Sequence, residues 1–286
     1  MNLKEALEKA QQDKVAIGHF NISDLAGLKG IANAARELKV PVIIGLSEGE
    51  RAFVGLNEAA ALVKSIREGY SQEIFINADH THSLESAIAA AKAGFDSIVY
   101  DRSDLPFEEN IKDTANAVIE LKKINPSIII EGEIGNIGTG SEIHEKAPEN
   151  IGLSTPEEAA RFVKETGVDV LAPAVGNMHG LLASMVSGEV KKRLHLDVIE
   201  SIKSATGLYL TLHGASGTND EDMQKAIQAG ITIIHINTEI RIAWRKGLDA
   251  ALLAHPDELA PSKIFPGVVQ SVQDVVKARL QLFNRM

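Results

Sequence analysis

Residues 73–80 read Glu-Ile-Phe-Ile-Asn-Ala-Asp-His, an apolar run with a polar end, and the segment Ser83–Ala93 that follows has helical periodicity. A short apolar run of this kind predicts a strand that is buried on both faces of a parallel sheet. A strand followed by a helix is the repeating unit of α/β proteins. This stretch therefore predicts one strand–helix unit of an α/β fold.

The same unit recurs along the whole chain. The other predicted strands are Val15–Asn21, Val40–Ser47, Ser97–Arg102, Ile128–Gly135, Val168–Gly176, Leu208–Ser216 and Ile231–Thr238. Helical periodicity lies between them at Leu25–Leu38, Glu108–Lys123, Pro156–Glu165 and Glu221–Ala229. Eight such repeats predict a (β/α)8 TIM barrel, and the 286 residues fit one barrel domain spanning residues 1–286. A doubly wound open sheet is disfavoured, because residues 20–24 lack a glycine-rich dinucleotide turn.

The composition limits the partners and the kind of metal site. A net charge of −10 disfavours binding to nucleic acid and to anionic membranes, which leaves a small molecule as the expected partner. The chain has no cysteine, so a metal must be held by His, Asp or Glu. Residues 1–14 read as a polar helix rather than a signal peptide, and no apolar run is long enough for a membrane span. We therefore expect a cytoplasmic protein.

Ligand-type residues lie where the predicted strands end. His80, His179 and His213 follow strands three, six and seven, and the strand ends of a barrel converge on one mouth. Three imidazoles with an open fourth position suit a catalytic zinc ion. Of the other histidines, His19 and His82 flank this mouth as candidate supporting groups. We expect solvated side chains at His144, His195 and His255.

Small residues accompany two of these histidines. Gly180 follows His179, and Gly214, Ser216 and Gly217 follow His213. Glycine lets a phosphate approach backbone N–H groups, and the last strands of this fold usually carry the phosphate site. The sequence thus predicts a metal site beside a phosphate site.

Five motifs resemble a known family. They are Ala78-Asp79-His80, Glu131-Gly132-Glu133-Ile134-Gly135, Gly176-Asn177-Met178-His179-Gly180, Leu212-His213-Gly214-Ala215-Ser216-Gly217 and Ile236-Asn237-Thr238-Glu239. In this order they resemble the class II, zinc-dependent ketose-bisphosphate aldolases, the group that includes fructose- and tagatose-bisphosphate aldolases. The resemblance begins near His19 and runs to the C-terminal helix.

The resemblance implies roles for individual residues. His80, His179 and His213 would bind one zinc ion per chain, which polarises the ketone and stabilises the charge formed when the carbon–carbon bond breaks. Asp79 would be the acid/base at the oxygen that becomes the aldehyde. Glu133 would approach the metal, whereas Glu131 looks structural. The substrate would be contacted by Gly180, Gly214, Ala215, Ser216, His235, Asn237 and Thr238.

The resemblance also implies partners: a sugar phosphate as substrate, a monovalent cation such as sodium near the site, and a homodimer or homotetramer. The expected reaction is reversible cleavage of a phosphorylated ketose, similar to fructose 1,6-bisphosphate, into dihydroxyacetone phosphate and an aldehyde. A Schiff-base aldolase would need a lysine at a strand end, and none of the predicted strands ends in one.

The chain departs from the family pattern around the substrate. Leu181–Ser184 stands where many members have a lysine, His235 replaces an asparagine, and Pro266–Val269 lacks an arginine for the distal phosphate. Ser47 matches the loop serine used for that phosphate. In the long loop Gly135–Ile151, Glu142 is the nearest candidate for the base that handles the carbon-bound proton.

Two alternatives stay open from the sequence. A barrel metallohydrolase could use the pair in His80-Thr81-His82, although such enzymes usually take this pair from the first strand. A sugar-phosphate-binding relative with little turnover would explain the altered substrate contacts.

Overall fold

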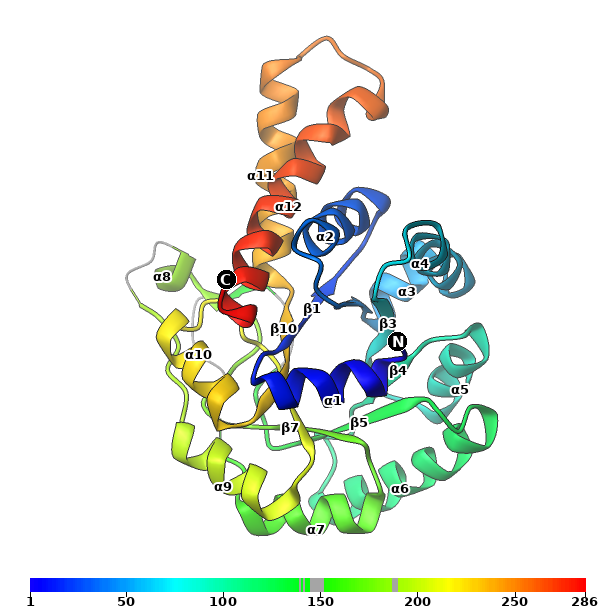
Figure 1. The fold of residues 1–286 in the computed structure, drawn as a ribbon, viewed down its shortest axis with the longest axis vertical. Helices are drawn as coiled ribbons and strands as arrows, with labels where there is room; N and C mark the ends of the chain where they lie inside the picture. Colours follow the sequence, from blue (N-terminus) through cyan, green and yellow to red (C-terminus); the bar gives the residue numbers. More distant parts are fainter. Residues whose placement is uncertain (139, 141, 145–151, 187–189) are drawn as a thin grey trace.

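The computed structural model describes residues 1–138, 140, 142–144, 152–186 and 190–286. Eight parallel strands close a barrel in the order β1-β10-β9-β7-β5-β4-β3-β2, with helices around it (Figure 1). The strands are β1 Ile17–Asn21, β2 Val42–Leu46, β3 Ile74–Thr81, β4 Ser97–Tyr100, β5 Ile129–Ile134, β7 Val170–Pro173, β9 Tyr209–Leu212 and β10 Ile231–Ile236. The predicted (β/α)8 barrel is therefore confirmed, and each barrel strand lies within or next to its predicted range.

The helices follow the strands as the periodicity predicts. Their bounds are α1 Leu3–Asp13, α2 Leu25–Leu38, α3 Glu48–Val54, α4 Leu56–Tyr70, α5 Leu84–Ala93, α6 Phe107–Ile124, α7 Pro156–Thr166, α8 Ala183–Val186, α9 Leu196–Thr206, α10 Asp220–Ala229, α11 Thr238–Ala254 and α12 Pro261–Asn284. A small sheet of β6 Ile143–His144 and β8 Leu181–Leu182 was not predicted. Strands of two residues are too short to show any periodicity.

Capping residues fix several helix starts. Thr155 accepts a hydrogen bond from the backbone N–H of Glu158, and the Glu158 side chain accepts one from the Thr155 N–H in return. Asn219 caps α10 by accepting hydrogen bonds from the backbone N–H groups of Glu221 and Asp222. Both caps satisfy N–H groups that a helix leaves free in its first turn. The two helix starts therefore lie where the sequence places them.

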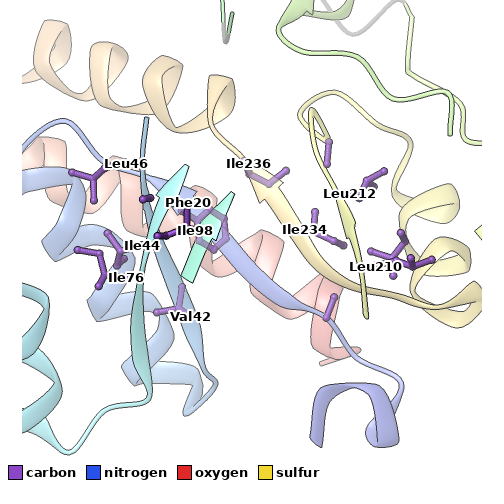
Figure 2. Packing of buried hydrophobic residues seen from close by; sticks show 14 of the residues in the cluster. Phe20, Val42, Ile44, Leu46, Ile76, Ile98, Leu210, Leu212, Ile234 and Ile236 are labelled. Atoms are coloured by element: carbon purple, nitrogen blue, oxygen red, sulfur yellow. The ribbon is translucent and has the colours of Figure 1, made fainter. Parts of the chain in front are cut away.

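The side chains of each barrel strand fall into two sets, one on each face of the sheet. Side chains alternate between the two faces of a strand, so one set points out towards the helices and the other into the barrel. The outward set packs under the helices and forms the main core (Figure 2). It includes Phe20, Val42, Ile44, Leu46, Ile76, Ile98, Leu210, Leu212, Ile234 and Ile236.

The inward set changes character along the barrel. At the N-terminal end it is apolar and packs against α1, through Ile17, Ile43, Phe75, Ile129, Val170 and Ile233. Two residues further along, the inward positions of five strands are polar and buried, and they are occupied by His19, Asn77, Glu131, Thr211 and His235. The strands therefore support one end of the barrel by packing and present polar groups at the other.

The chain ends in a long helix, α12. It begins at Pro261, and its buried residues include Val268, Val272 and Leu280. Since α11 already follows β10 as the eighth barrel helix, α12 is an additional helix packed against α2 and α11. In Figure 1 the far ends of α11 and α12 project away from the barrel. In the part of the chain that the structure describes, no helix is long and apolar enough to cross a membrane.

Candidate functional site

A small cavity opens at the polar end of the barrel. Most of its lining was predicted from the strand ends. The lining residues are Asn21, Asp79, His80, His179, Gly180, Gly214, Ser216, His235, Asn237 and Thr238. The tertiary structure thus brings the predicted metal and phosphate residues into one place, and it adds Asn21 from the end of β1.

The three predicted metal-binding histidines form a compact cluster. The ring centroid of His80 lies 4.8 Å from that of His179 and 4.9 Å from that of His213. One ligand nitrogen from each ring lies within 4.8 Å of the others. His80 reaches this position with a left-handed backbone, at φ 39°, which is uncommon for a residue with a side chain. Such strain is found at functional sites, where the surrounding structure holds it in place.

Each imidazole uses its second nitrogen to contact an acceptor outside the cluster. His80 Nδ1 lies 2.8 Å from Asp101 Oδ2, and His179 Nδ1 lies 2.8 Å from the Gly138 carbonyl oxygen. His213 Nε2 lies 2.5 Å from Glu131 Oε1. Such partners fix the tautomer and the orientation of a metal-binding histidine. Nε2 of His80 and of His179 and Nδ1 of His213 are therefore the nitrogens available to a metal.

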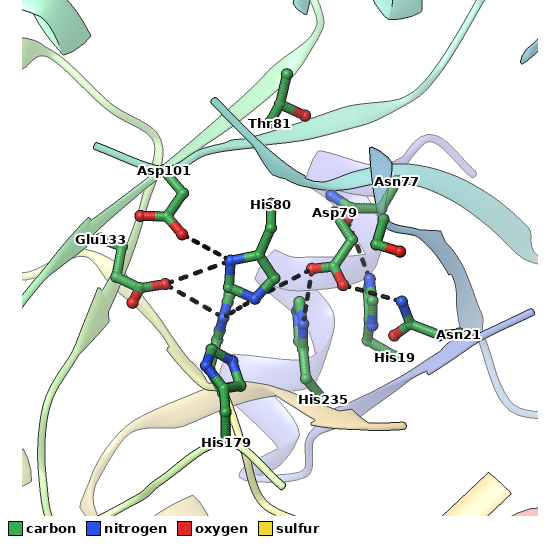
Figure 3. A network of polar contacts seen from close by, with 12 residues as sticks. His19, Asn21, Asn77, Asp79, His80, Thr81, Asp101, Glu133, His179 and His235 are labelled. Atoms are coloured by element: carbon green, nitrogen blue, oxygen red, sulfur yellow. Dashed lines mark hydrogen bonds and ion pairs between the residues drawn. The ribbon is translucent and has the colours of Figure 1, made fainter. Parts of the chain in front are cut away.

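Glu133 adds a carboxylate beside this cluster (Figure 3). Its Oε2 is buried without a hydrogen-bond partner, 3.4 Å from His213 Nδ1 and 3.9 Å from His80 Nδ1. Burial and the negative charge of Asp101 raise the pKa of Glu133 well above its usual value. A buried carboxylate oxygen without a partner costs free energy unless a cation compensates it. The donor set of three imidazoles and one carboxylate fits a zinc ion.

The protonation of the cluster depends on its carboxylates. Burial disfavours charge on His80, but the attraction of Asp79 and the contact with Asp101 outweigh burial and raise the pKa of His80 to about 10. Burial and the repulsion of His80 lower the pKa of His179 and of His213 to about 3. A metal would therefore bind two neutral imidazoles and displace a proton from the third.

Asp79 lies next to the cluster and is held from two sides. Asn21 Nδ2 donates a hydrogen bond to Asp79 Oδ2 at 2.9 Å, and His235 Nδ1 lies 3.4 Å from Oδ1. Burial opposes ionisation, but the charge of His80 and the contact with His235 hold the pKa of Asp79 well below its usual range. Asp79 is therefore an ionised carboxylate.

The rings of His19, His235 and His213 form a stack. The centroid of His235 lies 3.5 Å from that of His19 and 4.1 Å from that of His213. His19 thus supports the site through His235, in agreement with its predicted supporting place. His82 is exposed, its centroid lies 6.4 Å from that of His80, and the clusters of potential ligands among the described residues do not include it.

The predicted phosphate residues Gly180, Gly214, Ser216 and Thr238 line the same cavity. Gly180 and Gly214 have φ of 70° and 57°, and a Cβ at either would come within 2.3 Å of a neighbouring atom. The Ser216 hydroxyl is buried without a partner. Thr238 begins α11, whose N-cap Asn237 makes no side-chain cap bond. Uncapped N–H groups at a helix N-terminus attract anions.

Three predicted site residues lie outside the set that lines the cavity. Ser47 caps α3, where its Oγ accepts a long hydrogen bond of 3.5 Å from the Glu50 N–H. The Ala215 N–H donates to the His235 carbonyl oxygen at 3.3 Å. Glu142 is exposed. None of them is among the residues that line the cavity in the described part of the chain. Part of the predicted loop, at 139, 141 and 145–151, lies outside the described residues.

The prediction for the remaining histidines is partly wrong. His195 and His255 are exposed as expected. His144 is not fully solvated, because its Nε2 is buried without a hydrogen-bond partner. It lies against Gly180, where an added Cβ would come within 2.3 Å of it. The small β6–β8 sheet brings His144 to this place, and the sequence did not predict that sheet.

The sequence patterns did not identify three residues that contribute to the site: Asn21, Asp101 and Lys192. Asn21 and Asp101 lie at the ends of the first and fourth strands, so the strand-end rule applied to all strands would have found them. Lys192 lies in a loop, and its buried Nζ donates to carbonyl oxygens of Met178, Gly180 and Gly214. No pattern in the sequence points to it.

Comparisons with known proteins identify the family of the chain. Residues 1–286 match the model of a family described as fructose-bisphosphate aldolase class-II. A fructose-bisphosphate aldolase of Geobacillus stearothermophilus is 37% identical over 97% of this chain and 93% of its own. A probable fructose-bisphosphate aldolase of Bacillus subtilis (strain 168) is 35% identical over 99% and 97%. The crystal structure of the YdjI aldolase from Escherichia coli K12 is similar, with a TM-score of 0.83 and 29% identity over 99% and 96%. The chain belongs to the class-II fructose-bisphosphate aldolase family.

Proposed function

We propose that this protein catalyses the reversible aldol cleavage of a phosphorylated ketose, similar to fructose 1,6-bisphosphate, into dihydroxyacetone phosphate and an aldehyde. One observation carries this proposal. Three imidazoles with fixed orientation face a common point, and the ionised carboxylate of Asp79 lies beside them: Asp79 Oδ1 is 3.9 Å from His80 Nε2. The names of the relatives and the membership of the family support the same reaction.

Zinc is the metal that fits these residues best. His80, His179 and His213 would hold it, with Glu133 able to approach, because its Oε2 is buried and has no other partner. When bound, zinc supplies a Lewis acid that polarises a ketone and offsets the negative charge that develops during cleavage. Soft thiolate sites are excluded by the absence of cysteine.

Asp79 would move the proton at the hydroxyl that becomes the aldehyde. In the cleavage direction the carboxylate accepts this proton while the carbon–carbon bond breaks, and in the condensation direction it returns the proton. Asn21 and His235 hold Asp79 in place for this step. A second group must give a proton to the carbon of the dihydroxyacetone phosphate half, and Glu142 is our candidate.

The phosphate of that half would lie at Gly180, Gly214, Ser216 and Thr238. The orphaned Ser216 hydroxyl can donate to a phosphate oxygen, and the N-terminus of α11 adds uncapped N–H groups. We propose that Asn237 and His235 contact the carbon chain from the same side, since both line the cavity. Ala215 would contribute through its backbone, and Ser47, at the end of β2, would reach the far end of a longer substrate.

The metallohydrolase alternative loses its main support. It requires His82 as a ligand together with His80, and His82 is exposed and engaged with the Asp101 carbonyl oxygen at 3.2 Å. A binding protein without turnover is also disfavoured, because binding alone does not require an ionised Asp79 beside the three histidines.

The proposal is tested by assaying the purified protein for dihydroxyacetone phosphate release from fructose 1,6-bisphosphate and from other phosphorylated ketoses. We expect about one zinc per chain, loss of cleavage in EDTA and recovery with zinc. A protein that purifies without metal and does not take up zinc would refute the proposal. Slow hydrogen exchange into dihydroxyacetone phosphate, without cleavage of any ketose, would place the protein among the aldolases and leave its aldehyde partner open.

We further propose a homodimer or homotetramer in the cytoplasm. Leu253 and Leu259, near the tip of the projecting α11–α12 pair, are 84% and 90% exposed, and a second copy could cover them. Light scattering after gel filtration measures the mass, and a monomer at all concentrations would contradict the oligomer.

A further inference from the structure

Among the residues that the structure describes, Lys192 is the one lysine that is buried. The residue is 4% exposed, and its Nζ donates hydrogen bonds to the carbonyl oxygens of Met178 at 2.7 Å, Gly180 at 2.7 Å and Gly214 at 2.8 Å. Met178 and Gly180 flank His179, and Gly214 follows His213. One side chain therefore ties together two loops that carry metal-binding histidines.

The contacts require the charged form of the lysine. An ammonium has three N–H donors, one for each carbonyl oxygen, whereas a neutral amine has only two. Burial lowers the pKa of Lys192 to about 7, and the negative charge of Glu239 opposes this. The carbonyl groups and a bound phosphate both favour the ammonium, because each places negative charge near it.

The backbone of Lys192 is fixed as well. Its N–H donates to the Gly217 carbonyl oxygen at 3.0 Å, and its own carbonyl oxygen accepts from the Asn219 N–H at 3.2 Å. These bonds join the segment to the turn that follows His213 and Ser216. The main chain of Lys192 is therefore fixed beside this turn, which places the base of its side chain close to the carbonyl oxygens that the ammonium contacts.

Three converging carbonyl oxygens form the kind of site that binds an alkali cation. Resemblance to the family implies a monovalent cation near the metal, but here the ammonium of Lys192 already uses these oxygens. A sodium ion does not fit at this cluster while Lys192 is present. We propose that the ammonium of Lys192 is a built-in cation, which positions the loops of His179 and His213 and makes this enzyme independent of added sodium or potassium.

The position of the charge gives it a second effect on the reaction proposed above. Gly180 and Gly214, whose carbonyl groups bind the ammonium, also line the cavity beside Ser216. A fixed positive charge there attracts the phosphate in a protein whose net charge is −10. Lys192 is therefore a positioning residue for the metal loops and a local counter-charge for the substrate.

The first test uses the wild-type enzyme loaded with zinc. It is dialysed into a tetramethylammonium buffer, and kcat/KM is measured with and without potassium or sodium chloride at constant ionic strength. We expect the same value in all of these buffers. Stimulation by potassium or sodium would overturn the proposal, and this test requires no variant to fold.

Substitutions of Lys192 provide a second test, in which an added cation restores one variant and not the other. In Lys192→Ala the lost side chain leaves room for an ion, so we expect kcat/KM to fall about tenfold or more without added salt and to recover with potassium or ammonium. Lys192→Met fills the space without charge, so it should lose activity and not recover. Lys191→Ala, at the exposed neighbouring lysine, is the matched control and should behave as wild type.

A second readout does not depend on turnover. The Tm of Lys192→Ala should rise in a saturable way with potassium, whereas the Tm of wild type, of Lys192→Met and of Lys191→Ala should not. A folded Lys192→Ala that gains neither activity nor Tm would overturn the proposal. If the Tm of Lys192→Ala rises with potassium but the wild type cleaves no phosphorylated ketose, the proposed function is refuted. The proposal that the ammonium of Lys192 replaces an alkali cation is supported in that case.

Discussion

Glu131 Oε1 lies 2.5 Å from His213 Nε2, and both side chains are buried inside the barrel. The other oxygen of Glu131 accepts a hydrogen bond from Thr211 Oγ1 at 2.7 Å. This contact aims Nδ1 of His213 at the cluster, where it lies 3.3 Å from His80 Nε2. Glu131, which looks structural from the sequence, thus fixes the orientation of His213, a candidate metal ligand.

Replacing Glu131 by glutamine tests this relationship. The variant keeps the shape but loses the charge that holds the His213 tautomer, so we expect the affinity for zinc to fall about 10- to 100-fold. Competition with a chelator measures the Kd. Glu68→Gln, at an exposed carboxylate on α4, is the control and should bind zinc as wild type does. An unchanged Kd in Glu131→Gln would contradict the role given to this residue.

The Asp79→Asn variant separates metal binding from proton transfer. The amide can still occupy the position beside Asn21 and His235, but it cannot accept the hydroxyl proton. We expect kcat to fall about 10²- to 10⁴-fold while zinc content stays at the wild-type value. Steady-state kinetics and metal analysis check the two halves of this prediction. Loss of zinc together with activity would instead make Asp79 part of the metal site.

The orphaned hydroxyl of Ser216 should contribute to phosphate binding. In Ser216→Ala we expect KM for a phosphorylated ketose to rise about tenfold with little change in kcat, because a hydrogen bond to a charged group contributes about 1.5–3 kcal/mol. Thr218→Val is the matched control. Its hydroxyl is also buried without a partner, but the residue does not line the cavity. An equal rise of KM in both variants would mean that Ser216 acts only through packing.

Gly45 makes room for the ring of His19. A Cβ at Gly45 would lie 2.1 Å from His19 Cε1, so Gly45→Ala should force the imidazole away from Asn77 and destabilise the fold by about 1–3 kcal/mol. Gly69→Ala, on the exposed surface of α4 with nothing near the added Cβ, should instead stabilise by about 0.5–1 kcal/mol. Urea denaturation measures both free energies of unfolding. Wild-type stability in Gly45→Ala would show that the His19 ring has another place to go.

Zinc should stabilise the fold but should not be needed to form it. The packed cores consist of apolar side chains and include none of the three histidines. We therefore expect the zinc-free protein to keep its circular dichroism spectrum and to show a lower Tm. Titration with zinc should raise the Tm, by a free energy of about 4 kcal/mol when zinc reaches a thousand times its Kd. Unfolding of the zinc-free protein would show that the metal also holds the barrel.

The sequence by itself determined the fold and the candidate metal ligands. Apolar runs separated by helical periodicity fix an alternating α/β order, because a strand buried on both faces needs apolar side chains along most of its length. Polar residues that end these runs must lie at one rim of the barrel. His80, His179 and His213 could therefore be placed together before any contact between them was known.

Only the tertiary structure decided how these side chains are oriented and which groups they contact. Contacts across a barrel join residues far apart in the chain, such as Glu131 and His213, and local patterns do not record which nitrogen of a ring faces inward. The same holds for Lys192, which lies in a loop and reaches carbonyl groups of two other segments. The alternation of side chains along a strand tells whether a residue points into the barrel or out of it. Only the closed barrel determines which residues of other strands it contacts.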